Sequence, residues 1–149
     1  MKHAYNLARQ AFDCNEVPVG AVIVDRSTGQ VVARAHNQVE ARQNPTQHAE
    51  MLAIEAACRV LGTKYLTQCD LYVTLEPCPM CASAISLARL GRLYFGAYDP
   101  KSGGVEHGPC VFNGATSLHH IPEVVGGLME LECGELMTEF FAQRRAEKK

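Results

Sequence analysis

Two short segments restrict what this chain can fold into more than any other part of its sequence. The first is His48-Ala49-Glu50, and the second is Pro77-Cys78-Pro79-Met80-Cys81. One imidazole and two thiols form a three-ligand set of the kind that holds catalytic zinc, with a fourth position left open for water. Thiolates and a neutral imidazole suit zinc better than magnesium or calcium. We therefore expect a fold that brings His48 together with Cys78 and Cys81 around Zn²⁺.

Glu50 follows the histidine by two residues, which places a carboxylate beside the expected water. The pattern H-x-E followed by P-C-x-x-C is the signature of zinc-dependent nucleobase deaminases. Zinc lowers the pKa of a water that it binds from near 16 to about 7. In this chemistry Glu50 takes the water proton, passes it to a ring nitrogen and later protonates the departing ammonia. The two segments therefore predict a hydrolytic deaminase with Glu50 as its catalytic residue.

Length, composition and charge limit the remaining possibilities. A chain of 149 residues with 47% apolar residues can bury a core of its own, so we expect one domain, residues 1–149. No apolar run is long enough to cross a bilayer, and the first six residues lack the apolar stretch of a secretion signal. We expect a soluble, cytoplasmic protein without a membrane partner. The net charge of -2 means that a nucleic-acid partner would need a local basic patch.

The apolar periodicity predicts one α/β sheet with helices on its faces. Helices are expected over residues 2–14, 47–61 (with Thr46 as its N-cap), 77–90 and 128–149, and strands over 19–24, 31–35, 71–75, 92–97 and 124–127. Residues 98–113 form a glycine-rich stretch that is long for a plain connection, so we expect it to be functional or locally folded.

Two other interpretations of the cysteine motif are open. A thioredoxin-like redox pair would use Cys78 and Cys81 but gives no role to the segment around His48. A structural zinc site would need a fourth ligand, and the candidates are Cys58, Cys69 and His36. Structural sites usually present their ligands in two close pairs, and His48 has no such neighbour. The cysteines outside the motif are expected to be small buried apolar residues.

The sequence resembles the bacterial tRNA adenosine deaminases, within the cytidine deaminase-like superfamily, over nearly its whole length. The matching segments are residues 17–22, 44–50, 71–78, 92–99 and 140–145. The resemblance implies a three-layer α/β/α cytidine deaminase-like fold with a central mixed sheet of about five strands. It also implies bound Zn²⁺, a homodimer, and conversion of the wobble adenosine of a tRNA anticodon stem-loop to inosine, with release of ammonia.

The resemblance also implies substrate contacts at named positions. Asn37 and the Ala49 backbone would hold the base, Val19 would line its pocket, and Asp99 would meet the ribose. Arg144 and Arg145 of the last helix would lie near the tRNA backbone. Together with Lys101, these two arginines are the candidate nucleic-acid contacts, within a possible basic collar that also includes Arg9, Arg42 and Arg89.

The sequence departs from the family's pattern in two places. Leu87 stands near the position where a histidine is expected. Residues 105–120, with His107, His119 and His120, resemble a sub-branch described only as nucleoside deaminases. Two alternatives to the tRNA enzyme therefore stay open. One is a deaminase of a free base or nucleoside such as guanine or cytidine. The other is a non-catalytic zinc-stabilised binding module, in which Glu50 would have no purpose.

Overall fold

The computed structural model describes residues 1–113 and 120–149. Its helices are α1 (Lys2–Asp13), α2 (Val39–Arg42), α3 (Ala49–Leu61), α4 (Pro79–Leu87) and α5 (Glu130–Glu147). Its strands are β1 (Gly20–Asp25), β2 (Val31–His36), β3 (Cys69–Leu75), β4 (Arg92–Ala97) and β5 (Glu123–Val125). The strands form one sheet in the order β2-β1-β3-β4-β5. β1 runs antiparallel to β2 and β3, whereas β3, β4 and β5 are parallel. The prediction of a mixed five-stranded sheet is confirmed.

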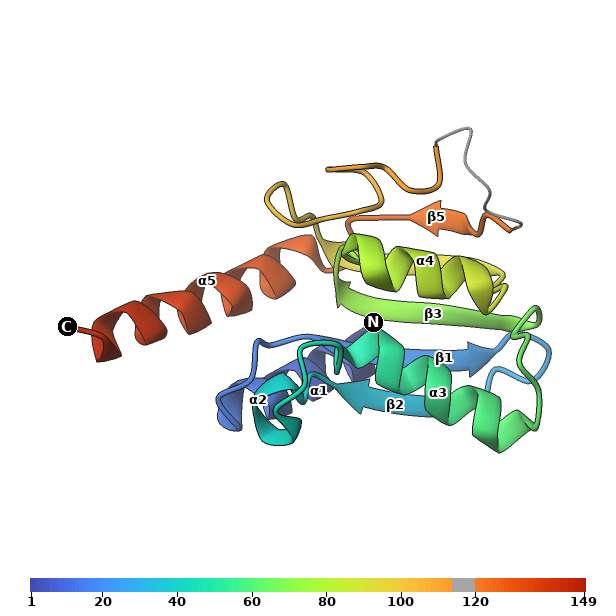
Figure 1. The fold of residues 1–149 in the computed structure, drawn as a ribbon, viewed down its shortest axis with the longest axis horizontal. Coiled ribbons are helices and arrows are strands. Elements are labelled where there is room, and N and C mark those ends of the chain that lie inside the picture. The colour runs from blue at the N-terminus through green and yellow to red at the C-terminus, as the bar shows by residue number, and fades with distance from the viewer. Residues whose placement is uncertain (114–119) are drawn as a thin grey trace.

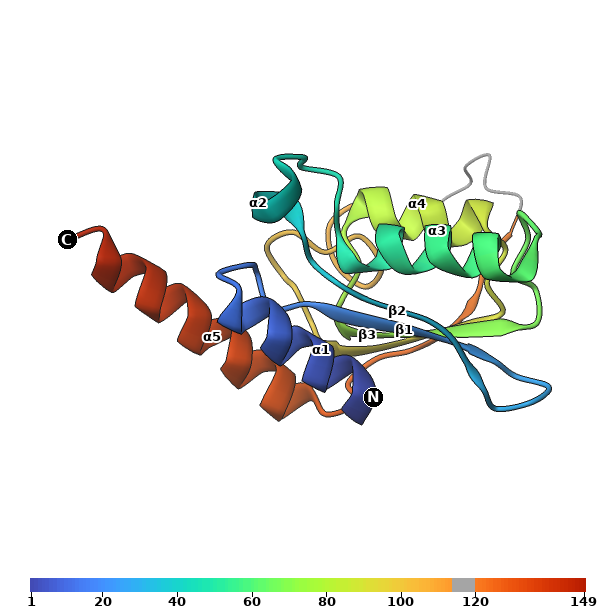
Figure 2. The same cartoon turned by 90° about the horizontal axis from the view of Figure 1, so that it is seen from below.

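The helices cover both faces of the sheet. Figure 1 shows α3 and α4 side by side in front of the strands, and Figure 2 shows α1 and α5 on the opposite face. β3 and β4 lie at the centre, and their side chains Leu71, Val73, Leu93 and Phe95 are fully buried. The predicted three-layer α/β/α arrangement is therefore confirmed. No helix in the described ranges is long and apolar enough to cross a bilayer.

Small residues allow α1 to lie close to the sheet. The helix buries Ala4, Ala8 and Ala11, one alanine per turn on the same side. Opposite them is Gly20 of β1, where an added Cβ would collide with the Ala4 carbonyl oxygen. Phe12 then packs edge-on against Phe140 of α5, with ring centroids 5.6 Å apart. This contact links α1 to the part of α5 that reaches the functional site.

The predicted elements occur with boundaries shifted by up to three residues, one local prediction is wrong, and one short helix was not predicted. The N-cap of α3 is His48, because Thr46 instead donates its hydroxyl to Asn44 Oδ1 at 2.8 Å. The four-residue helix α2 was not predicted, since it is too short to show helical periodicity. Its Ala41 N–H donates to Glu16 Oε1 at 2.7 Å, so a carboxylate distant in sequence caps it.

The cysteines outside the motif fit the expectation only in part. All seven cysteines are free. Cys69 and Cys133 are buried, as expected of small apolar residues, and Cys58 and Cys110 are partly exposed. Cys14 is exposed because it follows α1 at a turn on the protein surface. The expectation of burial is therefore wrong for Cys14.

Candidate active site

The predicted metal ligands lie at the starts of two neighbouring helices. His48 is the N-cap of α3, Cys78 is the N-cap of α4, and Cys81 lies in the first turn of α4. Pro79 occupies the first position of α4, where a missing N–H costs no hydrogen bond. Both helices begin at the carboxyl end of β3 (Figure 1). The partial positive charge of a helix N-terminus favours thiolate over thiol at this place.

The three ligand atoms have the spacing of a zinc site. His48 Nδ1 is 3.6 Å from Cys78 Sγ and 3.5 Å from Cys81 Sγ. Tetrahedral zinc with ordinary Zn–S and Zn–N bond lengths separates its nitrogen and sulfur ligands by about 3.6 Å. In the part of the chain that the structure describes, Cys58, Cys69 and His36 do not join this group of ligands. A three-ligand set with one open position therefore fits zinc, and a site closed by one of these residues does not form.

The two thiols of the site differ in proton affinity. Hydrogen bonds with Cys81 and with His48 lower the pKa of Cys78 to about 4. The hydrogen bond with Cys78, together with burial, raises the pKa of Cys81. The pair therefore carries one negative charge at neutral pH, which attracts a cation. Binding of zinc would displace the remaining thiol proton, because thiolate is the ligand form.

Glu50 lies where a proton carrier is needed. Its side chain is buried, with the residue only 4% exposed, and its Oε2 is 3.5 Å from Cys81 Sγ. Burial raises the pKa of Glu50, which brings a carboxyl group closer to the pH at which it can both accept and donate a proton. Glu50 therefore lies beside the ligand Cys81, and its role as the catalytic residue stays a prediction.

A cleft of about 480 Å³ opens over the metal ligands. Its lining includes His48, Cys78 and Glu50 together with Val19, Asn37, Asp99, Arg144 and Arg145. This volume is within the range of small-molecule sites. Apart from Ala49, Cys81 and Lys101, the site residues predicted from the sequence therefore border one cavity, although they come from six separate parts of the chain.

Ala49 lies behind the cleft and does not line it. It is fully buried, and its N–H donates to Asn37 Oδ1 at 2.8 Å. The Asn37 N–H in turn donates to the Val19 carbonyl oxygen at 3.1 Å. These bonds fix the Asn37 side chain at the cleft and leave its NH₂ group as the donor that a base could meet. A contact between the Ala49 backbone and a substrate stays a prediction.

Comparisons with known proteins identify the family. The model of the cytidine and deoxycytidylate deaminase zinc-binding region matches residues 1–97. The chain is 47% identical over 146 residues to the tRNA-specific adenosine deaminase of Rickettsia typhi, and the match covers 98% of each chain. The chain belongs to the tRNA-specific adenosine deaminases. It is accordingly a zinc-dependent hydrolytic deaminase, and neither a redox protein nor a zinc-stabilised binding module.

Solved structures agree with this family. One from a study of A-to-I editing by tRNA:A34 deaminases at the wobble position of transfer RNA has a TM-score of 0.87 and 48% identity, covering 91% of this chain and 96% of its own. A guanine deaminase from Bacillus subtilis has a TM-score of 0.61 and 30% identity, covering 97% of this chain and 90% of its own. This adenosine deaminase family member is thus closer in both fold and sequence to the tRNA-acting structure.

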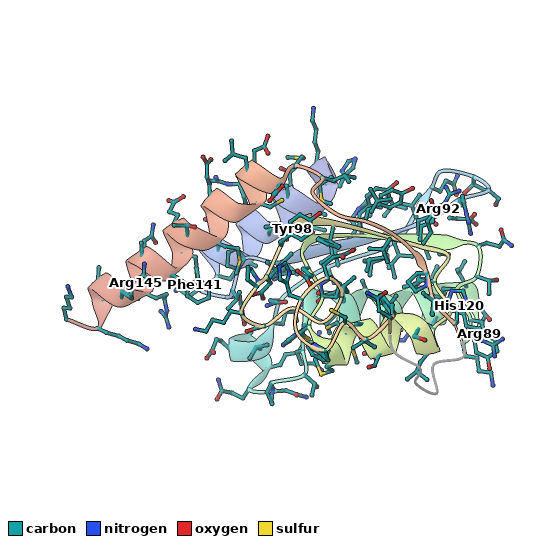
Figure 3. All side chains as sticks on the ribbon, turned by 90° about the horizontal axis from the view of Figure 1, so that it is seen from above. Arg89, Arg92, Tyr98, His120, Phe141 and Arg145 are labelled. Atoms are coloured by element: carbon teal, nitrogen blue, oxygen red, sulfur yellow. The ribbon has the colours of Figure 1, made fainter. Side chains whose placement is uncertain are left out.

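The predicted basic collar forms only in part. Arg144 and Arg145 line the cleft, and Lys101 lines an adjoining hollow that shares Asp99 and Phe141 with it. Arg89 lies at the opposite end of the molecule from Arg145 (Figure 3), with its guanidinium group 4.0 Å from the Tyr65 ring centroid. Arg42 borders a hollow on another side, and Arg9 is not among the residues lining the cleft. The positive charges of the collar that reach the site come from the end of α5 and from Lys101.

The glycine-rich stretch is folded around a residue that the sequence analysis did not single out. Glu76, only 1% exposed, accepts hydrogen bonds from the N–H groups of Asp99, Val105, Glu106 and His107 and from the His107 ring. Burial alone would raise the pKa of Glu76, but these donors hold it below its ordinary value. The expectation that residues 98–113 are locally folded is confirmed. The sequence shows only an acidic residue directly before Pro77-Cys78, and its burial and its partners come from the fold.

The remaining departures from the family pattern lie outside the cleft. Leu87 is 71% exposed on α4 and does not line the cavity. His120 Nε2 is 2.7 Å from the Leu90 carbonyl oxygen, so it belongs to a structural contact (Figure 3 shows its position). His119 lies outside the described residues. His107 is therefore the histidine of residues 105–120 that the structure links to the site, through Glu76.

Proposed function

We propose that this deaminase converts the wobble adenosine of a tRNA anticodon to inosine and releases ammonia, acting in the cytoplasm as one domain of residues 1–149. The observation that carries the proposal is the form of the cleft. The cavity that contains Glu50 is bordered by Arg144, Arg145 and Lys148 at the end of α5. A free base needs no such cationic border, whereas the backbone of a nucleic acid is bound by it.

The residues of the cleft can be assigned to parts of an extruded adenosine. The Asn37 NH₂ group would donate to the base, and Val19 would pack against its ring. Asp99 would accept a hydrogen bond from a ribose hydroxyl. Phe141, which is 41% exposed beside the cleft, offers an aromatic face for a neighbouring base. These contacts would fix the amino-bearing carbon above the metal ligands.

The proton transfers would use Glu50. Bound zinc supplies Lewis-acid activation of the attacking water at neutral pH. Glu50 accepts one proton from that water and delivers it to a ring nitrogen. It then transfers the second proton to the leaving amino group, so that adenosine and water give inosine and ammonia. The buried site around Glu50 holds its carboxyl group beside the reacting atoms throughout.

The salt dependence of binding tests the nucleic-acid part of this proposal. Affinity for an anticodon stem-loop should fall steeply as salt rises, because bound phosphates release counterions. Arg145→Ala should weaken binding at low salt and reduce the slope of log K against log salt by roughly one unit. Fluorescence anisotropy across a salt series measures both. Arg59→Ala is the matched control, since Arg59 lies on α3 and pairs with exposed Glu55. An equal effect of both substitutions would argue against the α5 contact.

The second candidate is deamination of a free base such as guanine, which the shared fold of the guanine deaminase favours. Such an enzyme would bind its neutral substrate with an affinity that hardly responds to salt. It would also be indifferent to Arg145→Ala. The same salt series therefore separates the two candidate functions.

We also propose that two copies pair through the outer surfaces of α3 and α4. Val60 and Leu87 are exposed apolar residues of these helices, and exposed apolar surface is suited to self-association. Leu87→Glu should convert a dimer into a monomer in sedimentation velocity. Leu131→Glu, at a residue that is equally exposed (70%) but lies on α5, should leave the dimer intact. A monomeric unmodified protein, or a dimer that survives Leu87→Glu, would refute this pairing.

A further inference from the structure

We propose that Glu76 is a positioning residue of this deaminase, which holds Asp99 at the mouth of the cleft with the help of His107. The inference rests on the proposed function, in which Asp99 meets the ribose of the substrate. Glu76 lies between β3 and the helix that carries Cys78, whereas Asp99 follows β4. The two residues are 23 positions apart in the sequence and are joined by one hydrogen bond.

The two oxygens of Glu76 have different partners. Oε2 accepts the Asp99 N–H at 2.9 Å and lies 2.9 Å from His107 Nδ1. Oε1 accepts the N–H groups of Val105, Glu106 and His107 at 3.3, 2.8 and 2.9 Å. One buried carboxylate thus ties the beginning of the loop to its later part. Charge-assisted bonds of this kind are roughly twice as strong as neutral ones.

The loop backbone packs closely against Glu76 and against the start of α4. At Gly103 an added Cβ would lie 2.5 Å from Glu76 Oε1 and 2.5 Å from the Asp99 carbonyl oxygen. The Gly104 N–H donates to the Pro77 carbonyl oxygen at 2.8 Å, directly before the first zinc cysteine. The loop is therefore fixed both to Glu76 and to the start of α4.

The Asp99 side chain is fixed by a second set of bonds. Its Oδ1 accepts the N–H groups of Lys101 and Ser102 at 3.2 and 2.9 Å. Within the described residues, no hydrogen-bond donor is recorded for Oδ2, and Asp99 lines the cleft. Glu76 thus determines where the backbone of Asp99 lies, and the Lys101–Ser102 turn determines how its carboxylate is oriented. A ribose hydroxyl would meet a preset acceptor.

His107 completes the arrangement from the solvent side. Its side chain is 36% exposed, and its ring also packs edge-on against Tyr98 at a centroid distance of 6.0 Å. The Nδ1–H bond to Glu76 keeps Oε2 oriented toward Asp99. This gives a role to one residue of the segment in which the sequence departs from the family's better-known members.

Glu76→Gln tests the proposal. Glutamine keeps one carbonyl oxygen for the three donors at Oε1 but places an NH₂ group opposite the Asp99 N–H. The KM for the anticodon stem-loop should rise about ten-fold, whereas kcat and the zinc content should stay within about two-fold of the unmodified enzyme. Amide hydrogen exchange should become faster in residues 99–107. Glu106→Gln, the same change at an exposed carboxylate of this loop, should alter none of these quantities.

His107→Ala is the second variant, because it removes one donor and leaves every backbone bond in place. It should raise the KM about five-fold with unchanged kcat. A merely structural role would lower kcat, zinc content and thermal midpoint together in Glu76→Gln and leave His107→Ala silent. That result, or an unchanged KM in both variants, would overturn the proposal. If the unmodified enzyme acts on a free nucleoside and not on the stem-loop, the proposed function fails. The KM for that nucleoside then decides the positioning role, since its ribose would meet Asp99.

Discussion

Glu50→Gln should lower kcat by about a thousand-fold while the protein still binds one equivalent of zinc. The glutamine side chain keeps the shape of Glu50 but cannot accept and return a proton, and positioned acid–base groups contribute about 10²- to 10⁴-fold. Glu50 Oε2 is 3.5 Å from Cys81 Sγ, but Glu50 is not one of the three residues that provide metal ligands, so the substitution should leave zinc binding intact. Single-turnover deamination and metal analysis of the same sample measure the two quantities.

The control for this experiment lies on the same helix. Glu55→Gln changes an exposed carboxylate of α3 that pairs with Arg59 at the protein surface. It should leave kcat within about two-fold of the unmodified enzyme, because surface pairs contribute little. A Glu50→Gln enzyme that retained a tenth or more of the activity would show that another group carries the protons.

Removal of zinc should abolish deamination. Among the cysteine variants, only substitution of a motif cysteine should cause loss of zinc and of activity. Cys78→Ala removes the thiolate at the N-cap position of α4 and leaves two protein ligands, so we expect bound zinc to fall below about a tenth of an equivalent. Activity should fall at least as far as in Glu50→Gln. In the unmodified protein, a chelator should have the same effect, and added Zn²⁺ should restore activity where Mg²⁺ does not.

Cys14→Ala provides the comparison, since Cys14 is a free, exposed cysteine outside the motif. It should retain zinc and full activity. Zinc content and turnover are measured together for each variant. Deamination that continued in metal-free protein would contradict the chemistry assigned to the site.

Local sequence patterns predicted the strands and the ligand set because both depend on near neighbours. β3 and β4 are short runs rich in aliphatic and aromatic residues, which favour a half-buried strand. Cys78 and Cys81 are three residues apart at a helix start, so one turn of α4 directs both sulfurs the same way. His48, 30 residues before Cys78, was assigned as the third ligand because the two segments together match the deaminase signature.

The N-cap of α3 could not be predicted from the neighbouring residues alone. A hydroxyl side chain at an N-cap usually accepts a hydrogen bond from the N–H of the second or third residue of the helix, which favoured Thr46 as the cap. In the structure the Ala49 N–H is bound by Asn37, from 12 positions earlier in the chain. His48 can then occupy the cap position with its ring directed to the cysteines. A long-range contact thus replaces the local one and frees the residue for metal binding.

The role of Glu76 was hidden for the same reason. Its partners are between 23 and 31 positions away, and no periodicity connects a residue after β3 with a loop after β4. The prediction of a basic collar had the opposite fault. The sequence suggested grouping arginines that the fold places on different sides of the molecule. Only the fold distinguishes Arg145, at the cleft, from Arg89, over the Tyr65 ring.

The most direct test of the central claim is a deamination assay on zinc-loaded protein, with Glu50→Ala as the blank. It compares an anticodon stem-loop carrying a wobble adenosine with free adenosine, guanine and cytidine, and detects inosine in the RNA and ammonia in solution. We predict inosine at the wobble position of the stem-loop and no turnover of the free compounds. Ammonia from a free compound, with the stem-loop unchanged, would contradict the tRNA function and identify a small-molecule deaminase.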